Sequence, residues 1–168
     1  MAPPDFIREK TSKYDFTQLV RQLDSSLDAV GAHLNGLTQA QADFKPSDLE
    51  WSVGEVIYHV CASVTGMLRI TYKLNRNEPF KHAMERSAMG LTVRDVPVDR
   101  LRNEWAAMRQ ELPTKLAALT PPLNEQTTFA HPDYGPLNAL EWLALNYLHN
   151  FRHAAQIQRI QSSAGYPR

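Results

Sequence analysis

The sequence predicts an all-α fold, a four-helix bundle, from three observations. Four segments carry apolar residues at spacings of three and four, which is the period of an amphipathic helix. No segment alternates apolar and polar residues as a half-buried strand does, and no repeat of solenoid period is present. The 168 residues suffice for one domain with a hydrophobic core. We therefore expect a single helical-bundle domain over residues 1–168.

The first two helices are predicted over residues 15–37 and 51–74. Gly36 is the expected stop of the first helix. Ser52 followed by Glu55 forms a capping-box pattern at the start of the second, because each side chain can bond a backbone N–H that has no helical partner. The apolar stripe of the first helix comprises Phe16, Leu19, Val20, Leu23, Leu27, Val30 and Leu34.

The third and fourth helices are predicted over residues 98–119 and 136–162. Pro113 interrupts the third, so a kink or a break in two is expected there. Asn138 and Glu141 offer a second capping pattern at the start of the fourth helix. The long connection over residues 76–97 leaves room for the chain to cross over, which would make the second and third helices parallel. Residues 120–135 are expected to be irregular, and the end of the chain after residue 162 to be frayed.

Charge and composition exclude several classes of function. The 18 basic and 18 acidic residues cancel, so net charge gives no sign of a nucleic-acid or membrane partner. No apolar run is long enough to span a bilayer, and the first residues do not form a secretory signal. The single cysteine, Cys61, has no partner for an internal disulfide, and a cytoplasmic location is expected.

His149 and His153 are four residues apart, so a helix places both imidazoles on one face, one turn apart. Trp142, Leu145 and Ile160 share that face, which indicates that the histidines point inward. A buried imidazole needs hydrogen-bond partners or a metal ion. The pair alone leaves metal binding and an ordinary buried or surface pair equally open.

His59 is the third candidate ligand. It lies away from the apolar stripe of the second helix, on a face with the small residues Ala62, Ser63 and Gly66. Small neighbours leave room beside the imidazole, although the same position suits a histidine that faces solvent. Three neutral imidazoles would suit a divalent zinc, nickel, cobalt, iron or copper ion. They would leave a coordination position open, as in catalytic zinc sites.

Two segments resemble motifs of one known family. Residues 51–59, WSVGEVIYH, look like the second-helix motif of the DinB-like (DinB/YfiT) superfamily, and residues 149–157, HNFRHAAQI, look like its last-helix motif. The segments GPL at 135–137 and EWL at 141–143 fit the same pattern. The resemblance covers most of the chain, and the two motifs together are more specific than either one.

The resemblance implies an up-down-down-up bundle, metal ligation by His59, His149 and His153, and frequent homodimers. Members of the superfamily include transferases that use low-molecular-weight thiols, a thiol-dependent isomerase of maleylpyruvate, and proteins described as metal-dependent hydrolases. A thiol cofactor is therefore implied by the resemblance alone.

Four further residues are candidates for the site. Glu55 lies one turn before His59, where it would support that ring or act as a general base, although the cap explains it as well. His131 lies just before the last helix. It is a candidate for a fourth metal ligand or a proton carrier, and the alternative is an ordinary turn residue. Gln156 shares the face of His149 and His153, within reach of an ion or substrate, and Trp142 is a candidate for the pocket wall.

The function predicted from these residues is metal-dependent catalysis on a small molecule. The ion would activate a thiol or water for attack on an electrophilic substrate. Three alternatives stay open: a metal-dependent hydrolase, a metal-binding bundle without turnover, and a plain helical bundle whose histidines are incidental. Cys61 points away from His59 and is interpreted as packing. A second apolar face on the last helix predicts a homodimer; it comprises Leu140, Ala144, Tyr147 and Phe151.

Overall fold

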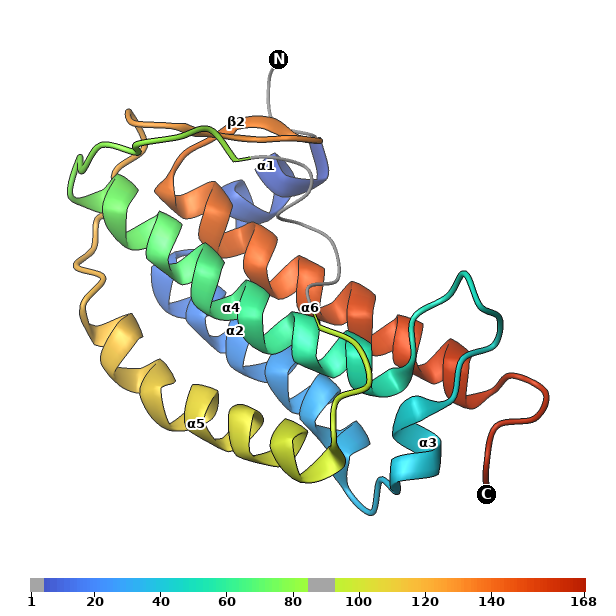
Figure 1. The fold of residues 1–168 in the computed structure, drawn as a ribbon. Coiled ribbons are helices and arrows are strands. Elements are labelled where there is room, and N and C mark those ends of the chain that lie inside the picture. The colour runs from blue at the N-terminus through green and yellow to red at the C-terminus, as the bar shows by residue number, and fades with distance from the viewer. Residues whose placement is uncertain (1–4, 85–92) are drawn as a thin grey trace.

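The computed structural model describes residues 5–84 and 93–168. Figure 1 shows α4 and α5 running in the same direction and antiparallel to α2 and α6, so the long helices follow the predicted up-down-down-up order. None of the helices in the described ranges is long and apolar enough to cross a membrane. The four long helices are α2 (Phe16–Gly31), α4 (Val53–Asn75), α5 (Val98–Ala117) and α6 (Ala139–Gln161).

Five shorter elements were not predicted. The hairpin of β1 and β2 pairs Phe129 with Leu137 and His131 with Gly135. Gly135, the first residue after the tight turn, has φ +72°. Three-residue strands are too short to show an alternating pattern, so periodicity could not reveal them. The shorter elements are α1 (Asp5–Lys13), the 3₁₀ helix η1 (Ala32–Leu34), α3 (Gln39–Asp43), β1 (Phe129–His131) and β2 (Gly135–Leu137).

The predicted caps of α4 and α6 are present. Glu55 N donates to Ser52 Oγ at 3.1 Å, and the Glu55 side chain accepts from Ser52 N at 2.8 Å. Asn138 and Glu141 form the same reciprocal pair at the start of α6. These bonds satisfy donors that the helix itself leaves unpaired, and they fix where each helix begins.

Two predicted helix features differ from the structure. α5 continues through Pro113 to Ala117, so the helix is not broken in two. Pro113 is exposed, and a proline there removes one helical hydrogen bond without placing its ring in the core. The first long helix ends at Gly31 rather than residue 37, and η1 continues the chain to Leu34 before Gly36 turns it at φ +66°.

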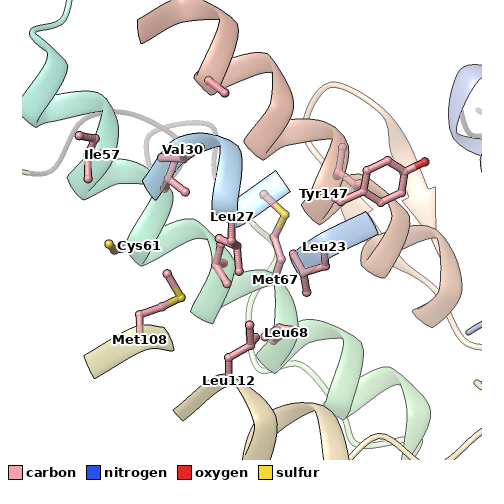
Figure 2. Close-up of a cluster of buried hydrophobic side chains, with 14 of the residues drawn as sticks. Leu23, Leu27, Val30, Ile57, Cys61, Met67, Leu68, Met108, Leu112 and Tyr147 are labelled. Carbon is pink, nitrogen blue, oxygen red and sulfur yellow. The ribbon is translucent and has the colours of Figure 1, made fainter. Parts of the chain in front are cut away.

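The core lies among the four long helices. Figure 2 shows side chains from α2, α4, α5 and α6 in one apolar cluster, with Cys61 among them. Cys61 is 8% exposed, in agreement with its interpretation as a packing residue. The labelled members of the cluster are Leu23, Leu27, Val30, Ile57, Cys61, Met67, Leu68, Met108, Leu112 and Tyr147.

The C-terminal residues are ordered against the bundle rather than frayed. Tyr166 packs edge-to-face on Phe44 with ring centroids 5.4 Å apart. Gln41 Nε2 donates to the carbonyl of Pro167 at 3.2 Å. The tail is therefore held by the loop that contains α3. The predicted connection over residues 76–97 lies partly outside the described residues.

The second apolar face of α6 is partly covered within the chain. α1 packs on α6 and buries Ile7. Tyr147 is 3% exposed, and burial raises its pKa, with smaller contributions from Tyr14 and Glu9. Phe151 remains 38% exposed. An intramolecular partner thus accounts for much of this face, and the homodimer stays a prediction.

Candidate metal centre

Three histidine side chains meet where α4 packs against α6. The His149 Nε2 atom lies 3.1 Å from His59 Nε2 and 3.1 Å from His153 Nε2. The ligand atoms of all three residues lie within 4.8 Å of one another. His59 and His149 are half-buried, and His153 is buried at 8% exposure. The packing of α4 on α6 brings the His59 face of one helix against the face of the other that carries His149 and His153.

The spacing of these nitrogens fits a shared divalent ion. An ion bound to imidazole nitrogens at about 2.0–2.1 Å separates those nitrogens by about 3 Å or slightly more. Two of the three nitrogen pairs, at 3.1 Å each, meet this condition, and the nitrogens of His59 and His153 lie within 4.8 Å of each other. Neutral rings that share hydrogen bonds would give similar distances, so the donor set permits an ion without requiring one.

The protonation state of the rings also suits a ligand role. Burial lowers the pKa of His59 to about 4 and that of His149 to about 2, and the charges of the neighbouring histidines lower both further. Burial also lowers the pKa of His153. All three imidazoles are therefore neutral near pH 7, and a neutral imidazole has the lone pair that a metal ligand needs.

Gln156 orients one of the rings. His153 Nδ1 lies 2.8 Å from Gln156 Oε1, an oxygen that accepts the Nδ1–H bond. This bond leaves the lone pair of His153 on Nε2, the atom that faces the other histidines. Trp51 stacks parallel to the His153 ring with centroids 6.1 Å apart and meets His59 edge-on at 5.0 Å. The sequence placed Gln156 correctly on this face, and the structure shows the atom that it contacts.

Ser63 is a further neighbour of the cluster, and the sequence alone indicated it only as a small residue beside His59. Its Oγ lies 3.2 Å from His59 Nε2. The spacing of four residues on one helix was the available signal, because it places Ser63 one turn after His59. The hydroxyl gives the cluster a polar edge on the α4 side.

Glu55 lies at the start of α4 rather than against His59. One carboxylate oxygen accepts the Ser52 N–H bond of the cap. The other oxygen accepts from Lys45 Nζ at 2.7 Å and lies 3.6 Å from Arg94. Its side chain is 1% exposed, so Lys45 and Arg94 supply the basic partners that a buried carboxylate needs. The geometry favours the cap over a role as base or as support for His59.

His131 is buried beside the same cavity. Its Nδ1 atom accepts the backbone N–H of Asp133 at 3.1 Å and that of Tyr134 at 3.3 Å. A neutral ring that accepts at Nδ1 carries its proton on Nε2. Ligation of an ion through Nε2 would sacrifice both backbone bonds, so the turn opposes a role as fourth ligand. A role as proton carrier through Nε2 remains compatible with these contacts.

A cavity of about 600 Å³ opens beside the three histidines. Trp142 forms part of its wall, is fully buried, and donates from Nε1 to the Phe129 carbonyl at 3.2 Å. Phe6 of α1 contributes to the wall and meets Tyr134 edge-to-face. Gly66 also lines the cavity, and a Cβ atom added there would meet nothing within 4 Å. The small residues near His59 therefore face open space, as the sequence predicted.

Comparisons with known proteins agree with this architecture. The crystal structure of TT2238, described as a four-helix bundle protein, aligns with a TM-score of 0.66 at 21% identity, covering 86% of this chain and 99% of that one. No curated protein matches the sequence. The family model of the DinB superfamily matches residues 22–157, which include all three histidines of the cluster. The chain therefore belongs to the DinB superfamily.

Proposed function

We propose that this protein is a metal-dependent enzyme in which His59, His149 and His153 hold one divalent ion, such as zinc or nickel. The proposal rests on one observation: three neutral imidazole nitrogens converge on the wall of a cavity large enough for a small organic substrate. The reaction proposed is attack by a thiol cofactor or water on an electrophilic small molecule. The thiol form is supported by the superfamily resemblance and the water form by the chemistry of three-histidine sites.

When bound, the ion supplies Lewis acidity that lowers the pKa of an approaching thiol or water, so that a nucleophile forms near neutral pH. The chain's own residues set the conditions for this step. Gln156 holds His153 with its lone pair toward the cluster. Trp51 stacks on His153 and Trp142 is fully buried in the cavity wall, and such apolar surroundings strengthen electrostatic contacts with a substrate.

A site whose fourth position is filled by protein would favour a metal-binding module without turnover. The cluster in the described part of the chain consists of three histidines, and His131 uses Nδ1 for backbone contacts instead. An open coordination position beside a cavity is the arrangement of catalytic rather than structural zinc sites. This arrangement supports the enzyme over the module.

The proposal is tested by the metal content of the untagged protein, measured by inductively coupled plasma mass spectrometry after loading with zinc or nickel. We expect about one ion per chain in the wild type. We expect nearly none in His149→Ala or His153→Ala, because the two remaining imidazoles are fewer than the three protein ligands that such a site uses. His82→Ala is the matched control, since His82 is exposed and outside the cluster. Equal metal content in all four proteins would contradict the ligand assignment.

Gln156→Leu tests the same site through a partial loss of metal affinity rather than a complete one. Loss of the Nδ1 acceptor should weaken metal affinity about 10–100-fold while the ligands remain, as for other residues that orient a metal-bound histidine. Gln158→Leu, two residues along α6 and exposed, should leave the affinity unchanged. Loaded wild type is then screened with low-molecular-weight thiols plus electrophiles, and with esters and amides, and turnover in neither screen would contradict the enzyme proposal.

A further inference from the structure

Arg152 lines the cavity, and in the sequence it lies between the candidate ligands His149 and His153. It follows His149 by three residues on α6, and a spacing of three places both side chains on the same face of the helix. The cavity wall includes Arg152 together with His149 and His153. Arg152 is also exposed to solvent, and an arginine can cover apolar surface with its alkyl stem while its charged end stays in water.

Within residues 5–84 and 93–168, no acidic side chain forms an ion pair with the guanidinium of Arg152. Arg109 on α5, by contrast, contacts Asp24 at 2.8 Å and Asp28 at 3.0 Å. No carboxylate of the described residues lies within 4.0 Å of Arg152. An unpaired cation at a cavity wall is available to a ligand.

The two ends of the cavity differ in charge and polarity. Near the histidines, a divalent ion would add positive charge that no carboxylate of the cluster offsets. Asp133 is the carboxylate among the described lining residues, and it already takes part in another interaction. Away from the histidines the wall is apolar or aromatic, and it includes Met67, Ile70, Leu145, Leu148 and Trp142. The cavity therefore combines a cationic end with an apolar body.

We propose that Arg152 forms an anion-binding subsite, and that the molecule taken by this cavity is an organic anion with an apolar or aromatic body. Its carboxylate pairs with the guanidinium, which presents donors in the planar geometry that a carboxylate matches. Its apolar part lies against the walls formed by α4 and α6. This inference deepens the proposed function and rests on it for the use of the cavity as the substrate site.

The test uses metal-loaded, full-length protein and two probes of nearly equal shape, 4-phenylbutyrate and 4-phenylbutanamide, with affinities measured by calorimetry. We expect the wild type to bind the carboxylate at least about tenfold more tightly than the amide, because charge-assisted hydrogen bonds are roughly twice as strong as neutral ones. Arg152→Gln should lose most of this preference while keeping its affinity for the amide. Arg159→Gln, exposed on the same helix and outside the cavity wall, is the matched control.

Metal content is measured on every sample, and the titrations are repeated on metal-free protein. A carboxylate preference that depends on Arg152 in either form supports the subsite, even if the metal proposal fails. A preference that is equal in wild type and Arg152→Gln overturns the inference, because another group would then recognise the anion. Absence of binding by either probe to wild type also overturns it.

Discussion

Two faces of α4 show how the same burial produces opposite chemistry. His59 and Cys61 are two residues apart, and burial is the main cause of the pKa shift of each. Burial lowers the pKa of His59 to about 4 and raises that of Cys61 to about 12. Both shifts favour the neutral form, since a low-dielectric environment disfavours charge. A neutral imidazole is a competent metal ligand, whereas a neutral thiol is unreactive.

The neighbours on each face explain why only one of them forms a site. Around Cys61 the face is filled with apolar side chains of the core, such as Val64 and Leu68. Around His59 the face carries Ser63 and Gly66, which leave the cavity open. The comparison teaches that burial sets the charge state, and that the space beside a residue decides whether it can bind anything.

The largest expected effect that separates the two faces comes from Leu68→Ala. Leu68 is 3% exposed in the core, and truncation of a buried leucine removes about 2–5 kcal/mol from the free energy of unfolding. Metal stoichiometry should stay unchanged. Chemical denaturation of metal-free protein measures the stability, and mass spectrometry measures the metal.

Ser63→Ala is the counterpart on the cavity face. Its hydroxyl contacts His59 Nε2, and no core packing is lost with it, so we expect a change within about 1 kcal/mol. Similar losses of stability in both variants would contradict the division of α4 into a core face and a cavity face.

The next expected effect is a pH dependence of the free energy of unfolding that comes from His149, beside the cavity. The pKa of His149 in the folded, metal-free protein is lowered to about 2 from 6.5. As the pH falls below 6.5, the unfolded chain binds a proton at this residue that the folded chain does not. Stability is therefore fully present above pH 6.5 and is lost on acidification, with a maximal slope of about 1.4 kcal/mol per pH unit for one group.

This linkage is isolated by subtracting the stability of His149→Gln, which lacks the titrating ring, from that of metal-free wild type between pH 7.5 and 5. The difference should fall as the pH falls. A difference that is flat or rises would mean that His149 is accessible to protons in the folded state. Cys61→Ser should show no such slope, because the thiol stays neutral throughout this range.

The parts of the fold that periodicity encodes were predictable. The four long helices and the caps at Ser52 and Asn138 follow from the sequence, because burial of an apolar stripe and pairing of free N–H groups are local requirements. α1 and the hairpin were missed, since nine-residue and three-residue elements depend on packing against α6 rather than on their own pattern. For the same reason, the sequence did not indicate that α1 packs on α6, although Phe151 on the second apolar face of α6 remains exposed and the homodimer stays a prediction.

The candidate site was predictable where helical spacing alone places the residues. Helical spacing places His149, His153 and Gln156 on one face. His59 was a candidate because of its small neighbours, and the superfamily resemblance implied that it is a ligand. The contacts of Glu55 with Lys45 and Arg94 were not predictable, because they join a helix start to two loops. Neither was the acceptor role of His131 Nδ1, which a three-residue turn creates.

The smallest expected change in stability tests whether the space beside Gly66 on the cavity face of α4 is open. Gly66 lies inside α4, and alanine in a helix interior is about 0.5–1 kcal/mol more favourable than glycine. Because a Cβ at Gly66 would meet nothing within 4 Å, Gly66→Ala should raise the free energy of unfolding by that amount without loss of metal. At Gly54 on the same helix, a Cβ would lie 3.2 Å from both the Ala42 carbonyl and Leu101, so Gly54→Ala should gain nothing or lose stability. If denaturation instead shows Gly66→Ala to be destabilised, the face beside His59 is packed rather than open, and the contrast between the two faces of α4 would not hold.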